Sequence, residues 1–396
     1  MGDMDDRISN FPDEILGHII SFLPTEDAYE TRILSKRWYP LWFLYPSPNL
    51  DYDYSRCIKN GKNGSDFKFM VYNTIFMRSE HQPMKSFRLR CDDNVINTVV
   101  AMEWLTKAAE QGMEYLDIHL CDMKIYNCKL SVFSFRNLVV IKLKEVWVEV
   151  SSSAVDLPLL RILHLNKVNF TDRMDLFYVL NGCPILEDLE AKNTSLHYGW
   201  LYDYDEYFID FYDEFKDFNN LVRADIMQFS DEEVPLKAFH NVEFLRLERI
   251  FQLLQVVYHV SPVFFNLTQL EFVFGGSTDW KFIFEVLKNC PKLQILVVEM
   301  PLTRYSYRVS WFPDNLPECL SLQFKSCTVT NYRGLKHELK FLRYILGIST
   351  SLESMRINSL PSLETLEKLE LMLKELIALP RSSSTCKVFL NDDCFA

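Results

Sequence analysis

The histidine and cysteine side chains that can ligate metals or act as nucleophiles are scattered along this chain. The closest group is His119, Cys121 and Cys128, and its spacing fits no zinc-binding pattern. The chain also lacks the His-Glu-x-x-His, phosphate-loop, nucleophile-elbow and dinucleotide-binding motifs. We therefore expect no catalytic residue, no metal site and no cofactor. The ten cysteines are predicted to be buried, reduced thiols.

The net charge excludes several classes of partner. It is −12, from 42 basic and 54 acidic residues, and such a surface repels phosphate backbones and acidic membranes, so we expect neither nucleic acid nor membrane as a partner. Residues 1–6 are acidic and contain no apolar segment of a secretory signal. No apolar run reaches the length of a membrane span. These features predict an intracellular protein, of the cytoplasm or the nucleus.

A repeated apolar pattern occupies most of the chain after residue 66. The spacing L-x-x-L-x-L recurs about every 25 residues, with conservative replacements, which is typical of leucine-rich repeats. The copies are Met84-Phe87-Leu89, Met113-Leu116-Ile118, Leu138-Ile141-Leu143, Leu160-Leu163-Leu165, Leu186-Leu189-Ala191, Leu221-Ala224-Ile226, Val242-Leu245-Leu247, Leu267-Leu270-Phe272, Leu293-Leu296-Val298 and Leu352-Met355-Ile357. One unit cannot bury its own apolar face, so the pattern predicts a stack of short parallel strands.

The residues between the apolar positions are the candidates for binding a target. Successive strand residues point to opposite sides, so these residues face outward on the concave side. They include Asp117, His119, Lys144, Asn166 and Glu248. We predict target contacts at Lys142, His164, Arg246 and Glu271.

One repeat is about ten residues longer than the others. The extra length coincides with 198–218, which mixes aromatic and acidic residues. Its composition fits a solvated loop, and it also fits a docking patch for a basic partner.

The first 45 residues predict helices with uncovered apolar residues. Pro12 suits a first helical position, and Asp13 and Glu14 favour the positive end of the helix dipole. Ile15, Leu16, Ile19, Phe22 and Leu23 then form an apolar stripe. Pro24 ends this helix, and Thr25 can cap a second one, whose inner face would include Ala28 and Leu34. Pro40 predicts a break near Tyr39.

This segment resembles the F-box of plant F-box proteins. The resemblance rests on Phe11-Pro12-Asp13-Glu14-Ile15-Leu16, Ile20-Ser21-Phe22-Leu23-Pro24-Thr25, Leu34-Ser35-Lys36-Arg37-Trp38 and Leu41-Trp42, with Phe11 in place of the usual Leu. It implies docking to the Skp adaptor of a cullin-based SCF ubiquitin ligase. By this similarity the contact residues are Phe11, Pro12, Ile15, Leu16, Ile19, Leu34, Ser35 and Trp38. A piece of this size buries too little surface to be stable alone, which agrees with a covering partner.

The last segment is similar to a second plant module, the FBD domain. The matching residues include Pro317-Glu318-Cys319-Leu320, Phe341-Leu342-Arg343-Tyr344-Ile345-Leu346, Leu352-Glu353-Ser354-Met355 and Pro380-Arg381-Ser382. Two further pieces, beginning at Cys183 and Cys290, resemble the Cys-Pro-x-Leu step of plant F-box repeats. Leu366, Leu369, Leu373 and Leu376 predict an amphipathic helix that covers the open end of the stack.

These patterns together predict an α/β chain with four segments. We expect a three-helix F-box (7–45), a linker (46–65), a curved, mainly parallel leucine-rich-repeat solenoid with helices outside (66–316), and an FBD-type α/β cap (317–390). The predicted function is a substrate-recognition adaptor of an SCF ubiquitin ligase, not an enzyme. Two alternatives stay open: a repeat scaffold that transfers no ubiquitin, and a small-molecule receptor on the concave face. The identity of the target does not follow from the sequence.

Overall fold

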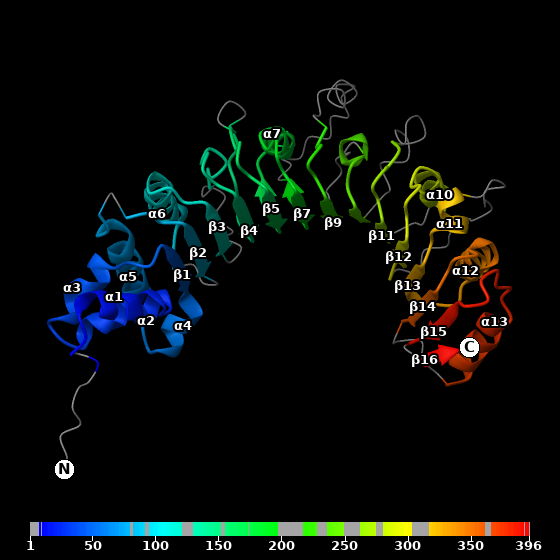
Figure 1. Cartoon of the computed structure of the whole chain (residues 1–396), viewed down its shortest axis with the longest axis horizontal. Coiled ribbons are helices and arrows are strands. Elements are labelled where there is room, and N and C mark those ends of the chain that lie inside the picture. Colours follow the sequence, from blue (N-terminus) through cyan, green and yellow to red (C-terminus); the bar gives the residue numbers. More distant parts are fainter. Residues whose placement is uncertain are drawn as a thin grey trace, which may run out of the picture. The chain divides into compact units, whose positions relative to one another are not determined.

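The computed structural model describes residues 8, 10–79, 82–91, 95–120, 130–151, 155–172, 174–196, 217–227, 236–248, 262–274, 280–302, 317–360, 366–391 and 393–395 (Figure 1). The chain divides into two compact units. Unit 1 comprises 1–186 and 194–201, and unit 2 comprises 187–193 and 202–396. Each unit is described separately below.

Unit 1 begins with short helices and continues into a parallel sheet. Its helices are α1 (Asp13–Ser21), α2 (Thr25–Glu30), the 3-10 turn η1 (Thr31–Ile33), α3 (Trp38–Leu44), α4 (Tyr54–Lys59), α5 (Gly64–Phe76), α6 (Thr98–Glu110) and α7 (Asp175–Asn181). Its strands are β1 (Asn49–Asp53), β2 (Ser86–Cys91), β3 (Tyr115–Leu120), β4 (Val140–Lys144) and β5 (Ile162–Asn166), with a small pair β6 (Asn169–Phe170) and β8 (Ser195–Leu196). Strands β1 to β5 are parallel neighbours in chain order.

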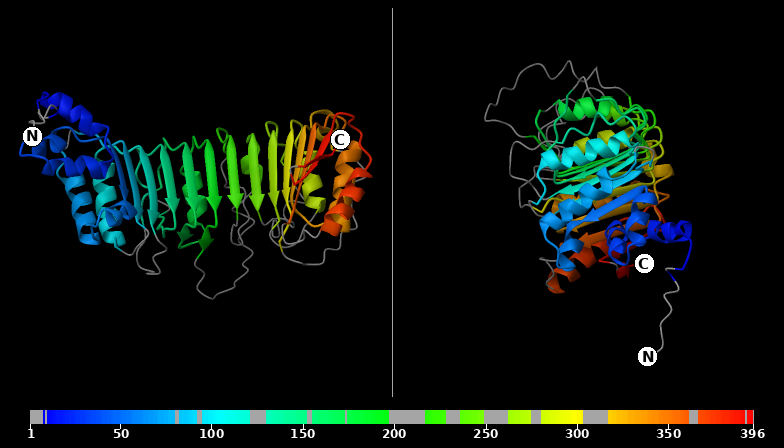
Figure 2. Two further views of the ribbon diagram at one scale, coloured as in Figure 1. Left: turned by 90° about the horizontal axis from the view of Figure 1, so that it is seen from below. Right: turned by 90° about the vertical axis from the view of Figure 1, so that its left-hand side faces the viewer.

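Unit 2 also contains a mainly parallel sheet. Its strands are β7 (Asp188–Lys192), β9 (Arg223–Met227), β10 (Phe244–Glu248), β11 (Gln269–Val273), β12 (Ile295–Glu299), β13 (Ser326–Tyr332), β14 (Ser354–Ser359), β15 (Lys387–Leu390) and β16 (Asp393–Phe395). Its helices are the 3-10 turn η2 (Leu236–Phe239), α10 (Trp280–Lys288), α11 (Glu318–Leu322), α12 (Lys336–Ile348) and α13 (Leu366–Ile377). Helices α10, α11 and α12 lie on one face of the sheet (Figures 1 and 2).

Alternation along each strand explains why these segments form the sheet. On β3 the inward residues Leu116, Ile118 and Leu120 are at most 3% exposed, and the residues between them are partly exposed. The predicted repeat positions on the other strands are buried in the same way. Each buried aliphatic side chain contributes roughly 1.5–3 kcal/mol. The parallel strand pairing and this burial pattern confirm the predicted repeats and the α/β fold class.

The predicted linker is wrong, because residues 46–65 contain a strand of the sheet. Strand β1 pairs with β2 in parallel register, from Asn49↔Ser86 to Asp53↔Arg90. Leu50 and Tyr52, which lie between Asn49 and Asp53 along β1, are buried. The repeat pattern therefore begins one strand earlier than predicted. Helix α4 follows directly, with the Asp53 side chain accepting from the Ser55 N–H at its start.

Three local predictions for the first helices also need correction. Thr25 makes no cap for α2, because its hydroxyl bonds elsewhere, as described below. Leu34 is 64% exposed and therefore gives α2 no inner face. The break expected near Tyr39 lies earlier, since α3 begins at Trp38. Pro40 is the third residue of α3, within the first turn, where the missing N–H breaks no helical hydrogen bond.

The segment predicted as an FBD-type cap adds strands to the sheet of unit 2. Strands β13, β14 and β15 extend β12 in parallel. The edge of β15 then pairs with β16 in antiparallel register. In the described part of α13, Met372 and Leu376 are buried and Leu373 is partly exposed. Strand β16 therefore covers the edge of β15, the last of the parallel strands. Helix α13 packs Met372 against Gly334.

The extra stretch of the long repeat unit falls almost entirely outside the described residues. Of the acidic and aromatic stretch 198–218, only Asp217 and Phe218 are described. Phe218 is buried, 4% exposed, and stacks on Phe239 with ring centroids 6.2 Å apart.

Candidate functional site

Helix α1 has apolar residues on two sides. Leu16 and Ile20 are at most 1% exposed and face the interior of unit 1. Ile15, Ile19 and Phe22 are 46%, 38% and 74% exposed. Their spacing of four and three residues places these three side chains along one line on the helix. Large apolar side chains left grouped in solvent mark a surface that another molecule covers.

Arg37 joins a second exposed apolar segment to this helix. Its Nε and Nη2 donate to Asp13 Oδ1 at 3.0 and 2.7 Å, and Nη2 also donates to the Phe11 carbonyl. Ile33 and Leu34, 70% and 64% exposed, lie four and three residues before Arg37 in the chain. The exposed apolar residues of the two segments are Phe11, Ile15, Ile19, Phe22, Ile33 and Leu34. We call these six residues the docking surface.

Most residues predicted for the Skp contact are exposed, but two are not. Phe11, Pro12, Ile15, Ile19, Leu34 and Ser35 are exposed. Leu16 is fully buried and Trp38 is 5% exposed. Both side chains belong to the core that joins α1 to α3, so they support the surface from beneath and do not form it. Substituting either one tests folding of the segment and not its docking.

Three residues of this region were absent from the predicted contact set. Phe22 lies seven residues after Ile15, and this helical spacing was visible in the sequence. Ile33 directly precedes Leu34, but its exposure depends on the η1 turn, which no sequence pattern predicted. The pairing of Arg37 with Asp13 spans 24 residues and follows only from the fold.

The helical segment is attached to the first strand by side chains of α2. The Thr25 hydroxyl accepts from the Asp51 N–H at 2.8 Å, and Glu26 Oε1 accepts from the Asp53 N–H at 3.0 Å. These N–H groups lie two residues apart on β1, along the edge that faces away from β2. An unpaired strand edge invites association with other chains. Thr25 and Glu26 therefore pair this edge and tie the helices to the sheet.

Burial affects the charge of Glu26. The residue is 5% exposed, and burial raises the pKa of its carboxyl above the ordinary value. The hydrogen bond from Asp53 and the charge of Arg56 act in the opposite direction, and the nearby carboxylates of Asp53 and Asp51 reinforce the shift.

Further contacts strengthen the same attachment. Arg78, 8% exposed, donates from both terminal nitrogens to the Ser47 carbonyl at 2.9 Å. Gln82 Nε2 donates to the Phe43 carbonyl at 3.0 Å. Asn73 on α5 donates to the Tyr29 hydroxyl at 3.1 Å. Within unit 1 the docking surface is thus carried by a segment fixed to the sheet at several points.

The strand residues that alternate with the buried ones form what we call the open face. In unit 1 the register aligns Arg88, Asp117, Lys142 and His164 in one row, and Arg90, His119, Lys144 and Asn166 in the next. The predicted target residues Lys142 and His164 are therefore direct neighbours on β4 and β5. Arg88 pairs with Asp117 at 3.0 Å and Asp51 at 3.7 Å.

The open face of unit 2 carries the other two predicted target residues. Arg246 and Glu271 are register partners on β10 and β11, and Arg246 Nε lies 3.5 Å from Glu271 Oε2. Glu299 approaches the same guanidinium at 3.7 Å. On β7 and β9, Lys192 and Arg223 each lie 2.9 Å from the carboxylate of Asp225, which is 1% exposed. The bases of this face are thus engaged by acids of the same face.

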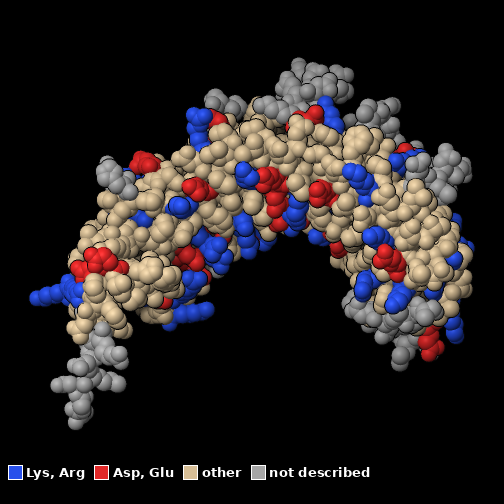
Figure 3. All heavy atoms as spheres, viewed as in Figure 1, with Lys and Arg blue, Asp and Glu red and all other residues tan. Residues whose placement is uncertain are grey.

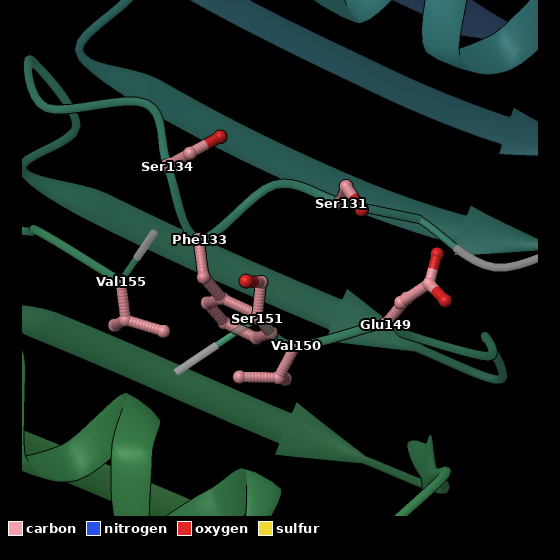
Figure 4. A pocket seen from close by; sticks show the side chains of 7 residues that line it. All are labelled: Ser131, Phe133, Ser134, Glu149, Val150, Ser151 and Val155. Atoms are coloured by element: carbon pink, nitrogen blue, oxygen red, sulfur yellow. The ribbon is translucent and has the colours of Figure 1, made fainter. Parts of the chain in front are cut away.

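A pocket in unit 1 is too small for a typical organic ligand. It holds about 40 Å³, room for a few water molecules, whereas ligand pockets typically enclose roughly 300–1,000 Å³. Figure 4 shows its lining by Ser131, Phe133 and Ser134 from one loop and by Glu149, Val150, Ser151 and Val155 from the following segment. Its polar groups are three serines and Glu149.

Seven cysteines are buried in the core: Cys57, Cys91, Cys183, Cys290, Cys319, Cys327 and Cys386. Cys183 and Cys290, of the two Cys-Pro-x-Leu steps, donate from Sγ to the carbonyls of Val179 and Val286 at 3.0 and 3.1 Å. Burial raises the pKa of Cys183 to about 12 and that of Cys290 well above its ordinary value. Within the described ranges no group of His, Cys, Asp or Glu is arranged to hold a metal ion. Cys121 and Cys128 lie outside those ranges.

In the described part of the chain, no helix combines the length and the apolar character needed to cross a bilayer.

The fold and the sites define a class of protein, one in which helices that expose apolar side chains are followed in the chain by parallel repeat strands. Comparisons with known proteins agree. The family model of the F-box domain matches residues 8–44, that of the LRR repeats of FBD-associated F-box protein At5g56370 matches 101–200, and that of FBD matches 313–357. The chain therefore carries an F-box, a leucine-rich-repeat segment and an FBD segment.

Three relatives from Arabidopsis thaliana cover most or all of this chain. F-box/FBD/LRR-repeat protein At5g56420 is 26% identical over 98% of this chain and 99% of its own length. Putative F-box/LRR-repeat protein At5g41840 is 28% identical over 78% of this chain and 72% of its own. Putative FBD-associated F-box protein At3g50710 is 24% identical over 98% and 100%. The resemblance to plant F-box/FBD/LRR-repeat proteins drawn from the sequence is confirmed.

Proposed function

We propose that this chain is a substrate-recognition adaptor of an SCF ubiquitin ligase. Its docking surface binds a Skp-type adaptor, which links it to a cullin, and its repeats hold a protein target. The observation that carries this proposal is the exposure of Ile15, Ile19 and Phe22 on the outer side of α1, within a segment matched by the F-box family model. Burial of this apolar surface against a partner supplies the free energy of docking.

Such an adaptor does no covalent chemistry itself. It raises the local concentration of a target lysine beside a ubiquitin-loaded enzyme, so geometry determines the rate. The hydrogen bonds that Thr25 and Glu26 accept from strand β1 support this role, because they hold the docking segment on the sheet of unit 1. Fixed attachment reduces the entropy lost when the complex assembles.

The proposal is tested by capture of a purified plant Skp adaptor and its cullin on the immobilised chain. The variant Ile15→Glu with Leu34→Glu places two charges on the docking surface and leaves the core untouched. We expect at least about a hundred-fold loss of affinity, since interface hot spots are worth about 2 kcal/mol or more each.

The matched control is Val99→Glu. Val99 on α6 is 74% exposed and lies outside the docking surface, so capture should stay unchanged. Equal capture by the double variant and the wild type would refute docking through this surface. Capture of Skp without the cullin would favour a scaffold that transfers no ubiquitin.

A further inference from the structure

Basic residues outnumber acidic ones on the open face of unit 1. The outward positions of β1 to β5 hold four bases, Arg88, Arg90, Lys142 and Lys144, and three acids, Asp51, Asp53 and Asp117. Asp117 is already engaged by Arg88. Among the described residues, no carboxylate lies within 4.0 Å of the charged groups of Lys142 or Lys144. Arg90 lies opposite Asp53 in the register, and its charge contributes to lowering the pKa of that carboxyl. Figure 3 shows basic side chains over the region of β2–β4.

This excess is unusual for the chain, whose net charge is −12. It also contrasts with the open face of unit 2, where β7 to β12 carry six acids and three bases. There each of the bases Lys192, Arg223 and Arg246 lies within 4.0 Å of at least two carboxylates. The two open faces therefore differ in the sign of the charge that they offer to a partner.

The spacing of these bases suits an extended chain. Lys142 and Lys144 lie two residues apart on β4, about 6.7 Å, which is also the separation of alternate side chains in an extended peptide. Arg90 lies two strands away from Lys144 in the same row, about 9.6 Å. Tyr115 adds a flat apolar surface between Arg88 and Lys142, whose charged groups lie 5.9 and 5.8 Å from its ring centroid.

We propose that the open face of β2–β4 binds an extended acidic segment of the target protein, with Arg90, Lys142 and Lys144 contacting its carboxylates. This inference rests on the proposed function, because it names the chemistry of the target that the adaptor holds. Exposed charge pairs are individually weak, so several carboxylates must be engaged together. Charge complementarity of this kind mainly sets specificity and the rate of association.

The test uses the full chain and a fluorescein-labelled deca-glutamate peptide, with deca-serine as the neutral probe. Fluorescence anisotropy should show binding of deca-glutamate only, and binding should weaken as salt shortens the Debye length from about 30 Å to about 8 Å. Lys142→Glu with Lys144→Glu should weaken it by about ten-fold or more. Lys142→Gln with Lys144→Gln should weaken it less and introduces no new charge beside Asp117.

The matched control makes the same change of charge elsewhere. Lys336 and Lys340 are exposed on α12, and reversing both should change the affinity by less than about two-fold. Equal binding of the two peptides, or equal loss in the control, would overturn the proposal. Peptide binding is measured without Skp, and Skp capture without peptide, so failure of this site is distinguishable from failure of the adaptor function.

Discussion

The Glu26 carboxylate accepts a hydrogen bond from the backbone N–H of Asp53 at 3.0 Å. This bond joins the second helix of the F-box segment to the first strand of the repeat sheet. Together with the bond from Asp51 to Thr25, it pairs a strand edge by side chains in place of another strand. The chain between Glu26 and Asp53 is therefore part of the folded unit and not a free linker. The helices of the F-box segment cover the outer edge of strand β1.

Removing the Thr25 hydroxyl should weaken this attachment. Thr25→Val keeps the shape of the side chain but leaves the Asp51 N–H without its acceptor, which we expect to cost about 1–3 kcal/mol. The free energy of unfolding from urea titration checks this value. Hydrogen exchange at the Asp51 amide should rise in Thr25→Val and stay slow in Thr25→Ser. Equal protection in all three proteins would contradict the assigned bond.

The stability of unit 1 should depend on pH through Glu26. Its pKa in the folded chain is raised by burial above 4.5, so between 4.5 and the raised value the folded state holds a proton that the unfolded state releases. This contribution to stability is therefore present below pH 4.5 and is lost as the pH rises through the folded pKa. Glu26→Gln keeps an acceptor for the Asp53 N–H without the charge.

Thermal melts of the wild type and of Glu26→Gln across this window separate Glu26 from other titrating groups. The wild type should lose stability relative to Glu26→Gln as the pH rises. A difference that stays constant over the whole window would show that Glu26 keeps its ordinary pKa.

Gly17 on α1 should tolerate no larger residue. A Cβ at this position would lie 2.2 Å from Cγ of the Tyr45 ring, so Gly17→Ala forces the ring to move and should cost about 1–3 kcal/mol. Gly347 on α12 is the control, because its Cβ would meet nothing within 4 Å, and Gly347→Ala should stabilise the helix by up to about 1 kcal/mol. Denaturant titration of both variants gives the comparison. A stabilising Gly17→Ala would mean that Tyr45 does not pack against this glycine.

Glu338 should be essential to the FBD segment. Its side chain is fully buried, and Oε2 accepts from the N–H groups of Arg333 and Leu335 at 2.9 and 3.0 Å. Glu338→Ala leaves both donors unpaired at the start of α12, which should cost about 2–6 kcal/mol. Loss of near-ultraviolet circular dichroism at lower temperature than in the wild type would show this effect. An unchanged melting curve would exclude the role.

The repeats were predictable because alternation is a strong signal. Pairs such as Leu116 and Ile118 recur at a nearly constant interval, and only an inward strand face requires that spacing. Strand β1 was missed because Leu50 and Tyr52 are interleaved with Asp51 and Asp53 after two prolines, so the pattern resembles a linker. Its strand character depends on the partner strand β2 and on the acceptors of α2, which are distant in sequence.

The docking surface was only partly predictable for a different reason. Helix α1 is apolar on two sides, and helical spacing alone does not tell which side faces the chain and which faces solvent. The structure assigns Leu16 to the core and Ile15 to the surface. On the open face, by contrast, the sequence predicted which residues point outward. It did not predict that Arg246 pairs with Glu271 or that Lys142 lies apart from the described carboxylates, because both depend on the neighbouring strands.

Footprinting of the docking surface by hydroxyl radicals, with and without purified Skp, tests the central claim most directly. Phe11 and Phe22, 46% and 74% exposed in the free chain, should lose most of their reactivity when Skp is bound. Phe69 on α5, 61% exposed, should keep its reactivity. If Phe11 and Phe22 stay as reactive in the complex as in the free chain, the docking surface is not where the partner binds.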